Sequence, residues 1–170
     1  APETLQKYKD LVLETAEGMA SYAYYEKEKD RYVLGPPLWL AQEIYDQTKS
    51  QNPTYELAYW RWALGVAQDW RVRLGMERDA HYDDIINKIS KLPVKDGKYV
   101  GLESIPDTWD NPASRQDHPS FLMADGFVPK GPLVDEKIMS ATLDAVLAHW
   151  DLAAKIWGWD YPMIAMTAAR

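Results

Sequence analysis

The acidic residues best suited to chemistry lie among aromatic residues, in parts of the chain that favour no regular structure. Glu43 follows Trp39 in a connection that contains a Gly-Pro-Pro sequence. We expect the rings of Trp39, Tyr59 and Trp60 to shield its carboxyl from water, and such shielding favours the protonated form that a general acid needs. The alternative is that Glu43 is an ordinary surface acid in a loop.

A second acid, Asp160, lies between aromatic residues in the sequence WGWDYP, which begins at Trp157. Pro162 marks the start of a helix, because proline is favoured at the first helical position. Asp160 therefore lies at or just before a helix N-terminus, where the helix dipole favours an ionised carboxylate. An ionised carboxylate is suited to act as a general base, and the alternative is ordinary capping of the helix.

Three further residues compete for these roles. Glu103 lies in a long irregular stretch, 92–117, and a loop of this length inside a domain is usually functional or disordered. Asp117 and His118 precede another helix start at Pro119, and they could bind sugar hydroxyls or serve as a cap and a loop residue. Carboxylates that move protons, beside rings that stack on sugar faces, are typical of sites that act on carbohydrate.

The composition argues against several other classes of protein. The 170 residues include eight Trp and 11 Tyr but no cysteine, which rules out thiol nucleophiles and cysteine-based metal sites. A net charge of −7 argues against nucleic acid as the partner, because phosphate binding needs a basic surface. The three histidines lack the spacing of metal motifs, and no phosphate-binding or dinucleotide-binding motif is present. We therefore do not expect a metal site.

The elements that would position these residues are helices. Apolar residues at helical spacing predict helices over 4–28, 52–74, 79–91 and 119–125, and from Asp135 and Pro162 onward, with a short strand at 98–101. Asn52 and Pro53 are expected to be the N-cap and first residue of the second helix, with Gly75 at its end. This helix is apolar nearly all round, so we expect it to be buried among other helices.

The length and the run of helices predict one helical domain over 1–170. The last helix is still apolar where the sequence stops at Arg170. We therefore expect the chain to be a piece of a longer protein. No apolar run is long enough for a membrane helix, and the first residues lack the features of a signal peptide.

Four segments of the chain are distinctive in combination. They are Val33–Pro37 with Gln42 and Glu43, Asn52–Trp60, Asp117–Ser120, and Trp157–Met163. Together they resemble the C-terminal part of the catalytic domain of bacterial six-hairpin glycosidases, in particular uncharacterised proteins related to glycoside hydrolase families 65 and 95. The resemblance spans most of the chain. In family 65 the general acid belongs to a Gly-Pro-Asp-Glu type of segment, whereas here the acid comes later, at Glu43.

The resemblance implies an all-α fold, an (α/α)6 toroid of which this chain would form about half the ring. It implies inverting hydrolysis of oligo- or polysaccharides, in which Glu43 protonates the glycosidic oxygen and Asp160 activates a water on the opposite face of the sugar. Glu103 or Asp117 could hold the base role instead. The substrate-binding residues would be Trp39, Gln42, Trp60, Asp117, His118, Trp157 and Trp159. No metal or organic cofactor is needed.

Other activities stay open beside hydrolysis. A non-catalytic carbohydrate-binding or structural toroid would keep the rings without needing Glu43. A polysaccharide lyase would need Arg or Lys in its cleft, and basic residues are scarce near the candidate segments. A phosphorylase would need a phosphate-binding motif, so hydrolysis is preferred.

The resemblance also sets expectations for location and partners. It implies a periplasmic or secreted location, because glycan-degrading relatives are usually exported. Half a ring would expose an apolar face, so we expect association with a second copy or with the rest of the same domain. Neither nucleic acid nor a membrane is expected as a partner.

Overall fold

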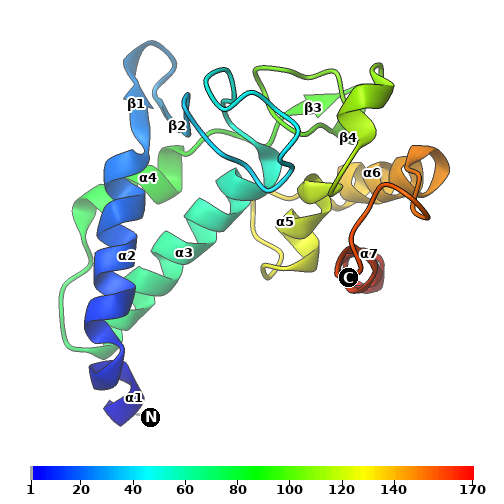
Figure 1. Cartoon of the computed structure of the whole chain (residues 1–170). Helices are drawn as coiled ribbons and strands as arrows, with labels where there is room; N and C mark the ends of the chain where they lie inside the picture. The colour runs from blue at the N-terminus through cyan, green and yellow to red at the C-terminus, as the bar shows by residue number, and fades with distance from the viewer. Residues whose placement is uncertain (1) are drawn as a thin grey trace. The chain divides into compact units, whose positions relative to one another are not determined.

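The computed structural model describes residues 2–170, and half of the chain (51%) is helical. Within these residues there are seven α-helices, three short 3-10 helices and two antiparallel two-stranded hairpins (Figure 1). The prediction of a mostly helical chain is confirmed. The prediction of a purely all-α fold is wrong, because two pairs of short strands are present.

The contacts within the chain divide it into two compact units, which we describe separately. Unit 1 contains the residues up to Val33 together with Trp60–Ser90, and unit 2 contains Leu34–Tyr59 together with Lys91–Arg170. One division falls inside the long helix α3 (Thr54–Arg73), so this helix contributes residues to both units.

Unit 1 is built from helices and one hairpin. Its elements are α1 (Pro2–Lys7), α2 (Lys9–Tyr22), β1 (Tyr24–Glu26), a 3-10 turn (Lys27–Lys29), β2 (Arg31–Val33), the later part of α3, and α4 (Ala80–Lys88). Figure 1 shows α2 alongside the later part of α3 and near α4. The buried core includes Met19, Ala20, Leu64 and Ile85.

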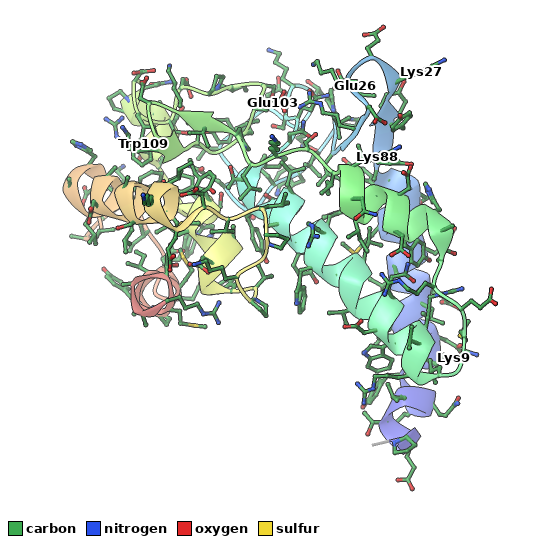
Figure 2. All side chains as sticks on the ribbon, turned by 180° about the vertical axis from the view of Figure 1, so that it is seen from behind. Lys9, Glu26, Lys27, Lys88, Glu103 and Trp109 are labelled. Atoms are coloured by element: carbon green, nitrogen blue, oxygen red, sulfur yellow. The ribbon has the colours of Figure 1, made fainter. Side chains whose placement is uncertain are left out.

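The hairpin corrects the predicted helix over 4–28. The chain leaves the helix after Tyr22 and pairs Tyr25 with Tyr32 across the two strands. Asp30 turns the chain with a left-handed φ of 47°, a conformation that Asp tolerates better than most residues. Lys88 at the end of α4 binds Asp30 at 3.1 Å, and Figure 2 shows it near the hairpin residues Glu26 and Lys27.

The start of α3 differs from the prediction. Asn52 is not the N-cap: it has a left-handed φ of 52°, and its fully buried side chain accepts the N–H of Leu34 and donates to Glu103. The first helical hydrogen bond runs from Leu57 N–H to the Pro53 carbonyl, so α3 begins one residue later than Pro53. The predicted end is confirmed, because Gly75 adopts a left-handed φ of 75° just beyond the helix.

The expected burial of α3 is only partly met. Leu57 and Leu64 have no exposed surface, whereas Trp62 and Val72 are 38% and 53% exposed. The helix therefore has a buried stripe rather than an apolar surface that is covered all round.

Unit 2 combines short helices with long irregular connections. Its elements after α3 are β3 (Val94–Lys95), β4 (Lys98–Tyr99), 3-10 turns at Pro112–Arg115 and Ser120–Leu122, α5 (Met123–Gly126), α6 (Glu136–His149) and α7 (Asp160–Ala169). Figure 1 shows α5, α6 and α7 gathered together. Phe121, Leu122 and Met163 form the buried centre. The expected strand at 98–101 is confirmed for its first two residues.

A close approach between α5 and α7 explains one glycine of unit 2. A Cβ at Gly126 would lie 2.6 Å from the Thr167 hydroxyl oxygen and 2.8 Å from the Met163 carbonyl oxygen. Only glycine allows the two helices to come this close. The contact fixes α7, and with it the segment that leads into α7.

The long stretch 92–117 is irregular, as predicted, but side chains hold it in place. The Trp109 indole donates to the Tyr99 carbonyl at 3.0 Å, and Figure 2 shows this residue beside the β3–β4 hairpin. The Thr108 hydroxyl accepts the N–H of Gly101. The Tyr99 N–H donates to Thr142 on α6. These bonds make the loop a fixed part of unit 2.

Candidate functional site

The first residue of α7, Asp160, lies at the centre of the candidate site. The helix begins at Asp160 rather than at Pro162, which occupies its third position. Asp160 has no exposed surface. Both of its carboxylate oxygens lie 3.0 Å from Nδ1 of His118, and Oδ2 also accepts the Trp157 N–H at 2.8 Å.

These contacts do not fit the predicted role of Asp160. A general base must reach the water that it activates, and a carboxylate without exposed surface does not reach solvent. Asp160 instead orients the ring of His118 and fixes the turn from Trp157 into α7. Asp160 lies at a helix N-terminus, as predicted. Its carboxylate does not reach the water that a general base would have to activate.

The His118 ring lies between two carboxylates. Nδ1 faces Asp160, and Nε2 lies 3.5 Å from Oδ1 of Asp117. The side chain of His118 is nearly buried, and its ring centroid lies 4.1 Å from the Trp159 ring. Asp117 has a left-handed φ of 62°, which sharply turns the backbone just before His118. The structure therefore brings together residues that are 42 positions apart in the sequence.

The carboxylate of Asp117 is held on both oxygens. Oδ1 accepts the indole N–H of Trp157 at 2.6 Å, and Oδ2 accepts the backbone N–H of Glu43 at 3.0 Å. The backbone carbonyl of Asp117 accepts the indole N–H of Trp150 at 2.9 Å. Charge-assisted hydrogen bonds of this kind fix the position of a carboxylate before any ligand arrives.

The aromatic rings around this carboxylate reach the surface. Trp157 is 60% exposed although its indole N–H is bound to Asp117, and Trp159 is 42% exposed. Phe127 stacks on Trp159 with ring centroids 5.5 Å apart. We call Asp117, His118, Trp157, Trp159 and Asp160 the Asp117 cluster. It presents exposed indole surface beside a fixed anionic acceptor, within unit 2.

Three other residues predicted to bind substrate lie in different settings. Trp39 is 60% exposed in unit 2. Gln42 is fully buried, and its amide donates to the carbonyls of Ser114 and Gln116, so it holds two loops together rather than facing a ligand. Trp60 belongs to unit 1, where its indole donates to the Met19 carbonyl.

The expected surroundings of Glu43 are wrong. Its side chain is exposed, so the predicted shielding of the carboxyl by aromatic rings is absent, and Trp60 is assigned to the other unit. The backbone N–H of Glu43 does reach the site, through its bond to Asp117. The role of Glu43 as general acid stays a prediction.

Glu103 has a structural partner. Its carboxylate accepts the side-chain N–H of Asn52 at 2.6 Å, just before α3 begins. Figure 2 shows Glu103 on a loop rather than on a helix. Its role as an alternative base stays a prediction.

The sequence analysis missed one acid, Glu56. It lies in the first turn of α3, where one carboxylate oxygen accepts the Ala41 N–H at 2.6 Å and the other has no hydrogen-bond partner among residues 2–170. Burial raises the pKa of Glu56 from 4.5 to about 7, and the backbone N–H groups of Ala41 and Glu56 itself oppose that rise. An acid among the apolar residues in the first turn of a helix expected to be buried was the signal that could have found it.

No group of three or more His, Asp or Glu side chains within residues 2–170 is arranged to hold a metal ion. None of the helices in that part of the chain has the length and apolar character needed to span a membrane.

No family model matches the chain, and no curated protein matches its sequence. The residues and their geometry are therefore the basis on which a function can be proposed.

Proposed function

We propose that unit 2 binds carbohydrate at the Asp117 cluster and that the chain forms part of a glycoside hydrolase catalytic domain. The observation that carries the proposal is the state of Trp157. Its ring is 60% exposed, yet its indole N–H is bound to Asp117 at 2.6 Å. An exposed ring that is already held in place can receive a ligand with little loss of side-chain freedom.

The chemistry of the cluster suits a sugar. Indole faces contact the apolar C–H faces of sugar rings, while a carboxylate accepts hydrogen bonds from sugar hydroxyls. The excess of acidic residues in the chain suits neutral sugars better than uronates. The preferred ligand class is therefore a neutral oligo- or polysaccharide.

The reaction we propose is inverting hydrolysis without a cofactor. Glu43 protonates the glycosidic oxygen, and Asp117 takes the place first given to Asp160 by activating a water on the opposite face of the sugar. Asp160 supports this arrangement by orienting His118. An inverting enzyme needs the two carboxyl groups roughly 6.5–9.5 Å apart when substrate is bound, which leaves room for the water.

The finer features of the fold and location come from the resemblance described above. Under this proposal the helices of the chain form about half of an (α/α)6 toroid, and the protein acts in the periplasm or after secretion. A second copy, or the rest of the same domain, would cover the apolar side of such a half ring.

A second candidate is binding of carbohydrate without catalysis. It is favoured by the fact that both carboxylate oxygens of Asp117 already accept hydrogen bonds from the protein. Such a carboxylate is a good fixed acceptor for a sugar hydroxyl but has less freedom to take a proton from water.

Turnover measurements on two variants distinguish these candidates. Wild type, Glu43→Gln and Asp117→Asn would be incubated with a panel of neutral oligosaccharides of both anomeric configurations, and products followed by NMR. Under the hydrolase proposal, wild type releases sugar with inverted configuration, and each variant loses at least about a hundredfold in kcat. Glu136→Gln, which alters an exposed acid on α6, serves as the control.

The outcomes separate cleanly. Sugar binding without turnover in wild type would support the non-catalytic candidate. An unsaturated product that absorbs ultraviolet light would instead indicate a lyase. Absence of both binding and turnover across the panel would contradict the proposed function.

A further inference from the structure

The buried acid Glu56 is connected to the Asp117 cluster through three consecutive residues. Glu56 is only 7% exposed, and within residues 2–170 its Oε2 atom has no hydrogen-bond partner. A buried polar atom without a partner is unfavourable, so it calls for an explanation beyond packing. The other carboxylate oxygen of Glu56, Oε1, binds a segment that leads to the Asp117 cluster.

The segment 41–43 is fixed at each of its residues. The Ala41 N–H donates to Oε1 of Glu56 at 2.6 Å. The side chain of Gln42 donates to the carbonyls of Ser114 and Gln116, both at 3.0 Å. The Glu43 N–H donates to Oδ2 of Asp117 at 3.0 Å. One end of the segment is therefore bound to α3, and the other end is bound to the Asp117 cluster.

We propose that Glu56 is a positioning residue for the sugar site. By holding segment 41–43, Glu56 keeps the Glu43 N–H in place to donate to Asp117. The proposal rests on the proposed function insofar as the positioned site binds sugar. Glu56 itself touches no ligand, because it is buried on the α3 side of the segment. Its effect passes through the backbone of Ala41 to Glu43 and then to Asp117 and Trp157.

The ionisation of Glu56 provides a way to observe this connection. Its carboxylate accepts the Ala41 N–H more strongly than the neutral acid does. Burial raises its pKa to about 7, so the change falls in an accessible pH range. The neighbouring phenol of Tyr55 has its pKa raised to about 12, by burial first and then by the charge of Glu56, and stays neutral there.

Other titratable groups lie along the same path and need a control. Glu43 is exposed on the segment itself, while Asp117 and His118 lie beyond it. A variant that removes only the Glu56 proton is therefore required.

The test is an NMR titration of the full chain without any ligand. The signals are the Glu56 carboxyl carbon, the Ala41 amide and the Trp157 indole N–H, the last assigned by its loss in Trp157→Phe. We expect all three to titrate with one midpoint near 7 in wild type. In Glu56→Gln the titration of Ala41 and Trp157 disappears, although both signals stay in place because the amide oxygen still accepts the Ala41 N–H.

Two further variants sharpen the result. Glu56→Ala removes the acceptor, so the Ala41 and Trp157 signals shift at every pH. Glu136→Gln leaves all three titrations unchanged. A Trp157 titration that persists in Glu56→Gln would belong to another group and would overturn the proposal. If the Glu56 variants fail to fold, different midpoints for Glu56 and Trp157 in wild type would overturn it equally.

Sugar binding is measured separately, so the two proposals can fail independently. Against the panel oligosaccharide that binds wild type best, we expect affinity to fall about tenfold in Glu56→Ala and to change little in Glu56→Gln. If no oligosaccharide binds wild type, the proposed function fails while the NMR titration still decides the positioning role. If affinity is unchanged in Glu56→Ala, the positioning role for the sugar site is wrong.

Discussion

The two units of the molecule differ in their buried polar groups. In unit 1, ion pairs such as Arg78–Asp83 and Lys88–Asp84 lie at the surface, where water also solvates the charges. In unit 2, His118 and Asp160 form a nearly buried pair. The buried side-chain oxygens that lack a hydrogen-bond partner within residues 2–170 all belong to unit 2; they include Gln42 Oε1, Glu56 Oε2, Ser120 Oγ and Asp125 Oδ1.

This difference favours unit 2 as the location of the proposed site. Unfavourable buried polar groups persist where the surrounding structure compensates for them, and they gather at functional sites. Unit 2 also holds the irregular backbone around Asp117 and the exposed rings of Trp157 and Trp159. Unit 1 resembles an ordinary packed helical scaffold, with its charged groups in water.

The largest effect that tests this comparison comes from breaking the buried pair. Asp160→Ala leaves the His118 ring and the Trp157 N–H without their acceptor. We expect the free energy of unfolding to fall by about 3–5 kcal/mol, the range for removing one member of a buried pair. In unit 1, Asp83→Ala breaks an exposed pair and should cost less than about 1 kcal/mol. Urea unfolding measures both, and equal losses would contradict the comparison.

The next largest effect is a pH dependence of stability. Because the pKa of Glu56 rises from 4.5 to about 7 on folding, the native state binds more protons than the unfolded state between these values. The contribution of the neutral carboxyl is fully present below about 4.5 and is lost as pH rises through about 7. Relative to Glu56→Gln, wild type should lose about 3 kcal/mol over this range. Urea unfolding at pH values on either side of the range measures the difference, and parallel pH profiles would show that Glu56 is not buried as an acid.

A matched pair of glycine substitutions compares close packing in the two units. Gly126→Ala places a methyl group against the Thr167 hydroxyl and the Met163 carbonyl, and we expect a loss of about 1–3 kcal/mol. Gly18→Ala in α2 meets nothing within 4 Å and should stabilise unit 1 by up to about 1 kcal/mol. Thermal unfolding shows the two signs directly. A stabilising Gly126→Ala would mean that α5 and α7 are not in close contact.

The smallest effect is one that the two units should share. Asp79 caps α4 in unit 1, and Asp135 caps α6 in unit 2, each by accepting two backbone N–H groups. Replacing either residue by Ala should cost about 1 kcal/mol. Equal losses in urea unfolding would show that the units differ in their buried polar groups and not in their helix ends. A much larger loss in the free energy of unfolding for Asp135→Ala than for Asp79→Ala would contradict that distinction.

Local signals in the sequence predicted the elements that depend on local chemistry. Asp135 and Gly75 mark helix ends where expected, because capping and left-handed glycine are determined by neighbours in the sequence. The same rule failed at Asn52. Its side chain accepts the Leu34 N–H and donates to Glu103, and both residues are distant in the sequence. The hairpin after Tyr22 was missed because tyrosines there continue a helical spacing.

Only those features of the site that depend on residue type could be predicted from the sequence. An acid and a histidine before a helix start singled out Asp117, and an acid among tryptophans singled out Asp160 and Trp157. The structure brings these three residues together. The environments of the carboxyl groups could not be predicted, because burial depends on segments far apart in the chain. Glu43 is left in water although Trp39 lies close to it in the sequence, whereas Glu56 is buried through its contact with Ala41, 15 residues away.

Binding of carbohydrate by unit 2 at the Asp117 cluster can be measured with one set of titrations. Calorimetric titration of the oligosaccharide panel would compare wild type, Trp157→Ala, and Trp62→Ala, which removes a 38% exposed ring from unit 1. We expect wild type to bind, affinity to fall about tenfold or more in Trp157→Ala, and affinity to change within about twofold in Trp62→Ala. Equal affinities for wild type and Trp157→Ala would contradict binding at the Asp117 cluster.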